Sequence, residues 1–248
     1  MNRRKIALVT GASAGIGAAV SVALAKADYQ VIGVARRLDK IRRLNEQLND
    51  AATKIDARCV DIRREADIES LFAYIRDEYG TLDVLVNNAG LGRDASLLDG
   101  ATDAWRHMFE LNVIALSVCT REAVKLMEHG QRAGHVVHIS SMSGHRVPTG
   151  SGGMYSATKH AVRALAEALR RELRAKQSPI RISSISPGFV ETEFAEVMSG
   201  SREVARDVYS RFECLQPKDI AASVLYLLSQ PQHVQIHDIL MRPTEQVS

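Results

Sequence analysis

The sequence predicts an α/β fold in which about seven parallel strands form one doubly wound sheet with helices on both faces. Three features predict it. Short runs rich in β-branched and apolar residues recur along the 248 residues, longer amphipathic stretches separate them, and the runs are apolar at nearly every position. Strands and helices that alternate at this spacing require right-handed crossovers and a parallel sheet. Strands that are buried on both faces lack polar alternation.

The strands are assigned from these runs in chain order. They are expected at residues 6–10 (IALVT), 30–34 (QVIGV), 57–60 (ARCV), 84–86 (VLV), 135–140 (HVVHIS), 181–186 (RISSIS) and 237–241 (HDILM). The stretches between them carry apolar residues at helical spacing, which predicts helices at 15–27, 38–50, 65–79, 102–130, 155–176 and 217–230. No Pro-, Gly- or Ser-rich linker and no internal repeat interrupts them, so residues 1–248 are predicted to form a single domain. Residues 190–214 break the rhythm after a strand end, and we expect a substrate lid there.

Composition and charge narrow the class of protein. Hydrophobic residues make up 46% and charged residues 25%, which excludes a disordered chain or a fibre. The net charge of +3 is dispersed and only 5% of residues are aromatic, so no nucleic-acid partner is expected. The odd, widely spaced set Cys59, Cys119 and Cys214 favours a reducing compartment. We therefore expect a cytoplasmic protein without a membrane span.

The N-terminus offers a competing interpretation. Arg3, Arg4 and Lys5 precede a small, apolar stretch, as in a signal peptide. Three glycines at positions 11, 15 and 17 and the polar helix that follows them argue against that interpretation.

The loop after the first expected strand is rich in glycine and reads TGASAGIG at residues 10–17. Glycines at such a turn let the backbone approach a pyrophosphate, and the start of the following helix supplies N–H donors. A glycine-rich loop can also be only a tight turn, but its position directly after the first strand favours a dinucleotide site in a Rossmann-type sheet.

The end of the second expected strand indicates which dinucleotide binds. Sites that prefer NAD carry an acidic residue there for the ribose 2′-hydroxyl, whereas this chain has Arg36 and Arg37. A guanidinium can pair with a 2′-phosphate through charge-assisted bonds, so NADP(H) is the expected cofactor. The alternative is that both arginines only solvate the start of a helix.

The expected reaction centre follows the fourth and fifth strands. Asn87-Asn88-Ala89-Gly90 forms a polar turn at a carboxyl strand edge, and the fifth strand is followed by a serine-rich turn. Tyr155 and Lys159 stand four apart, on one helix face. A nearby ammonium is expected to lower the pKa of the phenol, which would suit proton exchange with an alcohol or ketone.

These motifs together resemble the short-chain dehydrogenase/reductase superfamily over essentially the whole chain. They are the glycine-rich loop, the Asn-Asn-Ala-Gly turn, Asn112, the serine after strand five, the Tyr155 and Lys159 pair and Pro187-Gly188. Three further strings, CTREA at 119–123, SMSGHRV at 141–147 and MRPTEQ at 241–246, resemble the insect farnesol dehydrogenases and the vertebrate dehydrogenase/reductase member eleven. The bacterial 3-hydroxy acid dehydrogenases have a weaker version of that tail.

The resemblance implies roles for individual residues. Tyr155 would exchange a proton with the substrate oxygen, Lys159 would bind the nicotinamide ribose, and Ser141 would hydrogen-bond the substrate oxygen. Asn112 would hold a water linked to Lys159. The residues implied to contact the cofactor are Gly11, Ala12, Ser13, Gly15, Ile16, Gly17, Arg36, Arg37, Asp61, Ile62, Asn88, Ala89, Gly90, Tyr155, Lys159, Pro187, Gly188, Val190 and Thr192.

The serine assignment departs from the family pattern. Most relatives place the serine thirteen residues before the tyrosine, where this chain has Met142. We assign Ser141, on the assumption of one extra residue in the glycine-rich loop at 150–153, and Ser143 is the rival. His145 follows and is expected to line the substrate pocket beside Ser141 and Tyr155. His135 and His138 would face opposite sides of a strand, so no metal site is expected.

The expected function is an NADP(H)-dependent oxidoreductase that interconverts an alcohol and its ketone or aldehyde. The apolar residues Phe189, Phe194, Val197, Met198, Val204 and Val208 suggest a lipophilic substrate, such as an isoprenoid alcohol or a keto-steroid. A 3-hydroxy acid or semialdehyde is the alternative, which Arg146, Arg202 and Arg206 could serve. The intact catalytic set argues against a non-catalytic nucleotide-binding scaffold. By resemblance we expect a homodimer or homotetramer, and the sequence leaves open both this choice and the reaction direction.

Overall fold

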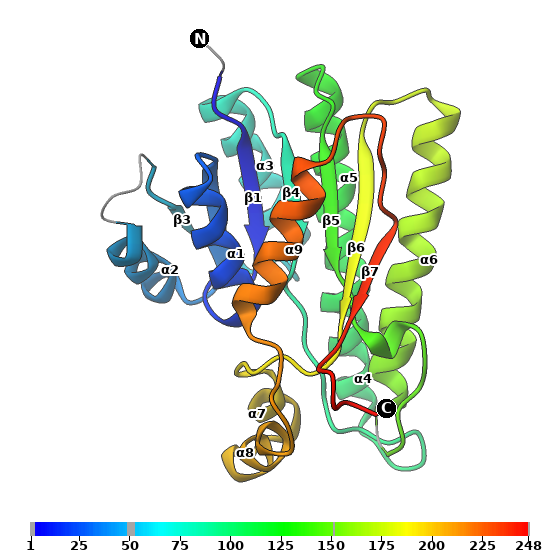
Figure 1. Ribbon diagram of the computed structural model, residues 1–248. Coiled ribbons are helices and arrows are strands. Elements are labelled where there is room, and N and C mark those ends of the chain that lie inside the picture. The colour runs from blue at the N-terminus through cyan, green and yellow to red at the C-terminus, as the bar shows by residue number, and fades with distance from the viewer. Residues whose placement is uncertain (1–2, 49–52, 151, 248) are drawn as a thin grey trace.

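The computed structural model describes residues 3–48, 53–150 and 152–247. Its seven strands form one parallel sheet in the order β3-β2-β1-β4-β5-β6-β7 (Figure 1). The strands are β1 (Ile6–Thr10), β2 (Gln30–Ala35), β3 (Asp56–Cys59), β4 (Val84–Asn87), β5 (His135–Ile139), β6 (Arg181–Pro187) and β7 (Asp238–Met241). All seven expected strands are confirmed, and each end falls within one residue of the expected position.

The helices agree with the sequence pattern in most places. They are α1 (Gly15–Lys26), α2 (Leu38–Leu44), α3 (Glu65–Tyr79), α4 (Thr102–Phe109), α5 (Leu116–His129), α6 (Gly153–Ala175), α7 (Phe194–Ser199), α8 (Arg202–Ser210) and α9 (Pro217–Ser229). The helix expected at 38–50 is α2 followed by a 3-10 turn at Asn45–Leu48, and its last two residues lie outside the described part.

One expected helix needs correction, and the expected lid segment contains two helices. The single helix expected at 102–130 is divided into α4 and α5 by a π-helical turn at Glu110–Ala115. The segment at 190–214, where a substrate lid is expected, contains the short helices α7 and α8, which the sequence pattern did not predict. Both helices are short and have few buried residues, none in α7 and Ala205 in α8, so neither has the buried apolar face of a core helix.

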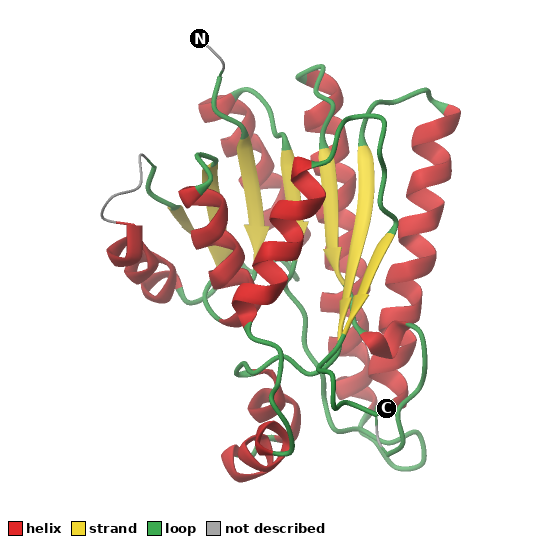
Figure 2. Cartoon of the chain, viewed as in Figure 1, coloured by secondary structure: helices red, strands yellow, loops and turns green. Residues whose placement is uncertain are grey.

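The sheet lies between two layers of helices (Figure 2). Successive side chains of a strand point to opposite faces. On β1, Leu8 therefore belongs to the core beneath α3, α5 and α6, where it joins Phe72, while Val9 belongs to the core beneath α1, α2 and α9, where it joins Val224. Both faces of the sheet are buried by this arrangement, which explains the uninterrupted apolar runs.

The strand order positions the functional site. The chain runs outward from β1 to β3 and then returns to place β4 on the other side of β1, so the crossovers diverge between β1 and β4. In open parallel sheets ligands bind at this point, outside the carboxyl ends of the strands. The α7 and α8 helices lie at the same end of the sheet, below the strand tips in Figure 1. In the described ranges, no helix has the length and apolar character that crossing a lipid bilayer requires.

Candidate functional site

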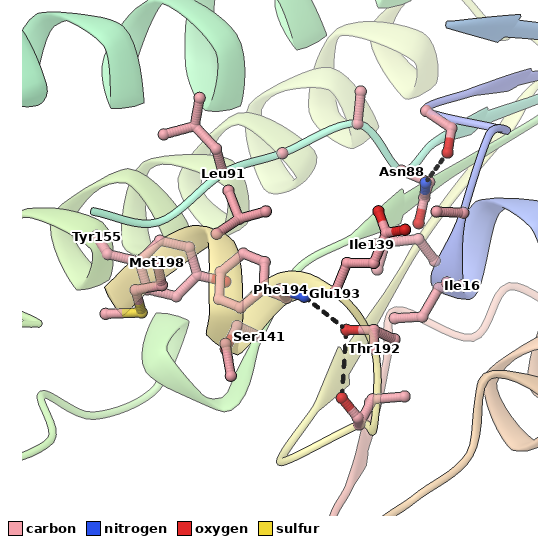
Figure 3. A pocket seen from close by; sticks show the side chains of 18 of the residues that line it. Ile16, Asn88, Leu91, Ile139, Ser141, Tyr155, Thr192, Glu193, Phe194 and Met198 are labelled. Atoms are coloured by element: carbon pink, nitrogen blue, oxygen red, sulfur yellow. Dashed lines mark hydrogen bonds between the residues drawn. The ribbon is translucent and has the colours of Figure 1, made fainter. Parts of the chain in front are cut away.

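A cavity of about 760 Å³ opens at the carboxyl ends of the strands. Its wall includes the glycine-rich loop, the turn after β4, the segment after β5, the start of α6 and helices α7 and α8 (Figure 3). Most of the predicted site residues line it: Gly11, Ser13, Gly15, Ile16, Arg36, Arg37, Asp61, Ile62, Asn88, Ala89, Gly90, Ser141, Tyr155, Lys159, Pro187, Gly188, Val190 and Thr192. Residues as far apart in the sequence as Gly11 and Thr192 thus meet in one cavity.

The glycine-rich loop requires two of its glycines for physical reasons. Gly15 has a φ of +53°, a backbone conformation that residues with a side chain rarely adopt. A Cβ on Gly17 would lie 2.3 Å from the carbonyl oxygen of Gly11, so only glycine lets the first turn of α1 pack beneath the loop. That helix begins without a side-chain cap and without an acidic residue in its first turn. No side chain therefore caps the N–H groups in the first turn of α1, which leaves them available to an anion in the cavity.

The turn after β4 is tied to this loop by Thr10 and Asn88. The hydroxyl oxygen of Thr10 accepts hydrogen bonds from the backbone N–H groups of Asn88 and Ala89, at 3.0 and 3.1 Å. In return, the Asn88 amide nitrogen donates to the carbonyl oxygens of Thr10 and Gly11, at 2.9 and 3.3 Å. These bonds hold the two loops at the point where the crossovers diverge.

Two arginines follow β2 at one end of the cavity. The Arg37 guanidinium donates to the Ser13 hydroxyl at 3.2–3.3 Å, which joins it to the glycine-rich loop. Arg36 is exposed. Nearby, the Arg63 guanidinium pairs with the Asp61 carboxylate, and their hydrogen bond lowers the pKa of Asp61 to about 2.

Ser141, Tyr155 and Lys159 meet at the other end of the cavity. Ser141 caps the 3-10 turn at Met142–Gly144, where its hydroxyl oxygen accepts from the backbone N–H of Ser143 at 3.1 Å. Tyr155 stands in the first turn of α6, and Lys159 one turn later. The Lys159 ammonium lies 5.7 Å from the centroid of the Tyr155 ring and donates to the carbonyl oxygen of Ile139 at 3.0 Å.

Burial dominates the electrostatics of this group. Loss of solvent raises the pKa of Tyr155 to about 12, and a hydrogen bond with the Ser141 side chain acts in the opposite direction. Lys159 is 6% exposed, and burial lowers its pKa to about 8. The pKa of Tyr155 is therefore raised by burial, where the sequence argument expected a fall caused by the neighbouring ammonium.

Asn112 lies in the π-helical turn and holds two segments together. Its amide nitrogen donates to the carbonyl oxygen of Leu91 at 2.8 Å and to the Thr158 hydroxyl at 3.0 Å, and its amide oxygen accepts from the Leu91 N–H at 2.9 Å. A Cβ on Gly90 would lie 3.3 Å from the Asn112 amide oxygen and 3.7 Å from the Lys159 nitrogen, so Asn112 is close to the lysine. Single π turns inside helices occur frequently at functional sites.

Helix α7 covers the end of the cavity that contains Tyr155. The Phe194 ring lies beside the Tyr155 ring, with centroids 5.5 Å apart and planes tilted by 53° (Figure 3). The other end of α7 is held by the Arg93 guanidinium, which donates to the carbonyl oxygen of Val197 at 2.8 Å. All six apolar residues proposed from the sequence line the cavity: Phe189, Phe194, Val197, Met198, Val204 and Val208.

Some expected residues do not line the cavity. Ala12, Gly17 and Asn112 lie behind its wall, and His145 faces away from it. The His145 Nε2 lies 2.9 Å from an Asp238 carboxylate oxygen and 3.2 Å from the Ser186 hydroxyl. The sequence predicts this histidine in the substrate pocket, which is wrong, because the 3-10 turn after Ser141 directs it toward β6 and β7. Of the three arginines considered for an acidic substrate, only Arg146 reaches the cavity.

Sequence reasoning missed several lining residues. Gln246, near the C-terminus, accepts a hydrogen bond from the Phe189 N–H at 3.0 Å. A Cβ on Gly188 would lie 2.1 Å from the same Gln246 oxygen. Only glycine at this position therefore lets the C-terminal segment pack beside the cavity. Tyr209 and Glu193 line the wall as well. The tail carried a sequence signal, because its letters contributed to the resemblance, but nothing in the pattern placed it beside β6.

The buried histidines of β5 have structural partners. His135 pairs with the Ser183 hydroxyl at 2.9 Å and His138 with the Thr120 hydroxyl at 3.3 Å, and burial lowers both pKa values to about 3. Within the described ranges, no group of three or more His, Cys, Asp or Glu side chains is placed to hold a metal ion.

Comparison with known proteins places this geometry in context. The profile of a family described as short chain dehydrogenase matches residues 5–202. Dehydrogenase/reductase SDR family member 11 of Homo sapiens is 49% identical over 252 residues, covering 99% of this chain and 96% of the human protein. Farnesol dehydrogenase of Aedes aegypti is 39% identical over 246 residues, covering 96% of each chain.

Solved structures agree in fold. The closed form of a serine dehydrogenase complexed with NADP+ superposes with a TM-score of 0.89 at 32% identity, covering 98% of this chain and 96% of that one. A metagenomic short-chain oxidoreductase in complex with NADP gives a TM-score of 0.80 at 29% identity, covering 98% of each chain.

Proposed function

The chain belongs to the short-chain dehydrogenase/reductase family, and we propose that it uses NADP(H) to interconvert a lipophilic alcohol and its ketone or aldehyde. Family membership makes it an oxidoreductase of alcohols or carbonyl compounds with a nicotinamide dinucleotide. The finer proposal rests on one observation. Tyr155, Lys159 and Ser141 stand at one end of a cavity that has the Arg36 guanidinium at its other end.

The residues of the cavity fit a dinucleotide. Its volume lies within the range of cofactor sites, about 300–1,000 Å³. Gly17 has no room for a Cβ, and the start of α1 is uncapped, so the loop can bring backbone N–H groups to a pyrophosphate. Asn88, Ala89, Gly90, Pro187, Gly188, Val190 and Thr192 would hold the nicotinamide half, and Asp61 and Ile62 the adenine.

Arg36 supports NADP(H) over NAD(H). Arg36 and Arg37, not an acidic residue, follow β2 directly, and the Arg36 guanidinium is exposed at the cavity edge. A guanidinium there would bind a 2′-phosphate through charge-assisted hydrogen bonds. The NADP complexes of two structural neighbours lend support to this choice.

Three side chains would carry out proton transfer and stabilise the charge that develops on the substrate oxygen. When bound, the nicotinamide supplies or accepts the hydride at its C4. Tyr155 carries its proton at neutral pH, since burial raises its pKa to about 12, and it would donate that proton to a carbonyl oxygen. Ser141 would donate a hydrogen bond to the same oxygen and stabilise the developing alkoxide. Lys159, with a pKa near 8, would bind the ribose and favour the phenolate after proton transfer.

The apolar wall contributed by α7 and α8 supports a lipophilic substrate. Phe194, Val197 and Met198 form a lid above Tyr155 that would bury hydrocarbon and exclude water. A second candidate is a 3-hydroxy acid or semialdehyde. Arg146 lines the cavity and could pair with a carboxylate, and the serine dehydrogenase neighbour supports this reading.

A substrate panel tests both candidates. Isoprenoid alcohols, keto-steroids and 3-hydroxy acids would be assayed with NADP(H) and with NAD(H), comparing kcat/KM. We expect the highest values for apolar substrates with NADP(H). A preference for NAD(H) of about tenfold, or ~1.4 kcal/mol, would refute the role of Arg36. A preference for 3-hydroxy acids that Arg146→Ala abolishes would favour the second candidate.

Tyr155→Phe tests the mechanism itself. Removal of the phenol hydroxyl deletes the proton donor but keeps the ring beside Phe194. We expect kcat to fall by about 10²–10⁴-fold, the usual contribution of general acid catalysis, while NADPH binding persists in a calorimetric titration. Tyr226→Phe is the matched control, since Tyr226 is exposed on α9. Unchanged turnover in Tyr155→Phe would refute the proposed chemistry.

A further inference from the structure

An ion pair joins the lid to the opposite side of the cavity. Glu193 is the residue that precedes α7. One carboxylate oxygen lies 2.8 Å from a terminal nitrogen of Arg37, and the other lies 2.6 Å from the Lys40 ammonium on α2. The lid is thereby attached to the segment after β2, more than 150 positions away in the chain. Both cations act on the carboxylate, and they lower the pKa of Glu193.

Arg37 occupies the centre of this arrangement. Its Nε and one terminal nitrogen donate to the Ser13 hydroxyl on the glycine-rich loop, and its other terminal nitrogen pairs with Glu193. The guanidinium that should help to bind a 2′-phosphate therefore already carries a carboxylate partner. The Arg36 guanidinium, in contrast, makes no hydrogen bond or ion pair within the described ranges, although its charge contributes to the lowered pKa of Asp61.

We propose that Glu193 is a specificity-determining residue, whose carboxylate competes with the 2′-phosphate of NADP(H) for Arg37 and Lys40 and so couples the cofactor phosphate to the position of the lid. This inference rests on the proposed function, because it assumes that a 2′-phosphate binds beside Arg36 and Arg37. A carboxylate next to a phosphate site repels the incoming anion and also occupies donors that the anion would use.

Displacement of Glu193 by the phosphate would affect Tyr155 through Phe194. Phe194 follows Glu193 directly and lies against the Tyr155 ring. The far end of α7 is held independently, by Arg93 on Val197 and by the Asp94 N–H on the Met198 carbonyl oxygen at 3.1 Å. Coupling is reciprocal for binding free energies. The free energy by which the Glu193 ion pairs weaken phosphate binding therefore equals the free energy by which bound phosphate weakens those ion pairs.

Calorimetry with adenosine 2′,5′-bisphosphate and with ADP tests the competition, because only the bisphosphate carries the 2′-phosphate. Neither probe carries a nicotinamide, so no turnover takes place. We expect Glu193→Gln to bind the bisphosphate about three- to tenfold more tightly at low salt, the effect of losing two exposed ion pairs, and to bind ADP unchanged. Glu196→Gln is the matched control. Glu196 lies on α7 and pairs with Arg202 at 2.9 Å, away from the cavity. The control should bind both probes like the unmodified chain.

Three outcomes would overturn the inference. Equal affinity of Glu193→Gln and the unmodified chain for the bisphosphate removes the competition. Weaker ADP binding by Glu193→Gln would instead make Glu193 a ligand of the ribose hydroxyls. A gain in both Glu193→Gln and Glu196→Gln would indicate a general charge effect. If the unmodified chain does not prefer the bisphosphate over ADP at all, the proposed cofactor choice fails rather than the role of Glu193.

Hydrogen exchange of the lid tests the coupling. In the unmodified chain, the backbone amides of α7 should exchange several-fold faster with the bisphosphate bound than with ADP bound, because the phosphate displaces the Glu193 carboxylate. In Glu193→Gln the two probes should give equal, fast exchange. Equal exchange with both probes in the unmodified chain would contradict the coupling.

Discussion

Replacement of Lys159 by methionine should stabilise the folded chain at neutral pH while removing its activity. The ammonium is 6% exposed, and burial lowers its pKa from 10.5 to about 8. The difference corresponds to about 3 kcal/mol in the free energy of unfolding. Methionine has a similar length and carries no charge to desolvate.

The sign of the effect follows from proton binding. Below pH 8 the lysine is charged in both states, so the folded chain bears the full cost of burying the charge. Between pH 8 and 10.5 the unfolded chain binds more protons, and the free energy of unfolding rises with pH. Above pH 10.5 both states are neutral at this position, and the cost has disappeared.

The variant also loses a contact. The hydrogen bond from Lys159 to the carbonyl oxygen of Ile139, at 3.0 Å, cannot form with methionine. An unsatisfied buried acceptor costs about 1 kcal/mol. The net gain for Lys159→Met should therefore be about 2 kcal/mol at pH 7 and should fall to about zero at pH 10.

Urea unfolding at pH 7 and pH 10, at one fixed protein concentration, measures this change. Lys5→Met serves as the control, because Lys5 is exposed ahead of β1. The control should show the same small difference from the unmodified chain at both pH values. A stability difference for Lys159→Met that is independent of pH would refute the reasoning that burial of this charge destabilises the fold.

Three further substitutions test the cavity. Arg36→Ala should lower the kcat/KM ratio of NADPH to NADH by about tenfold or more, the value of one charge-assisted bond, and an unchanged ratio would place the 2′-phosphate elsewhere. Gly17→Ala puts a Cβ 2.3 Å from the Gly11 oxygen, so NADPH binding should be lost in calorimetry, and retained affinity would contradict the proposed loop. Gly92→Ala puts a Cβ 3.0 Å from Phe194. This variant should move α7 and so raise KM for the alcohol, while its affinity for ADP stays constant. A change in ADP affinity alone would show that Gly92 acts on the cofactor instead.

The fold was predictable because the local pattern and the tertiary environment agree. A strand that is buried on both faces has to be apolar along its length, and each such run in the sequence became a strand of the sheet. The helices that pack on the sheet need an apolar stripe and were found for the same reason. The exceptions are α7 and α8, which lie over a cavity, and the π turn at Glu110–Ala115, whose residues keep helical periodicity.

In the candidate site, too, some residues follow from a sequence pattern and others do not. The glycine-rich loop, Tyr155 and Lys159 carry short-range patterns, since a tight turn demands glycine and one helix face fixes two side chains. Glu193, Gln246 and the direction of His145 have no such pattern. Their partners are Arg37, Phe189 and Asp238, which lie far away in the chain.

The sequence by itself determined the strand–helix alternation and the glycine turn beside the first helix, and it indicated the side chains that we propose as the reacting groups. These depend on residue type and spacing over one or two turns of chain. Only the tertiary structure decided how much water each group loses and which charges meet across the cavity. Burial raises the pKa of Tyr155 where spacing alone predicted a fall, and Glu193 reaches Arg37 through folding rather than proximity in sequence. Solvent exclusion and long-range charge pairing arise only when distant segments pack together.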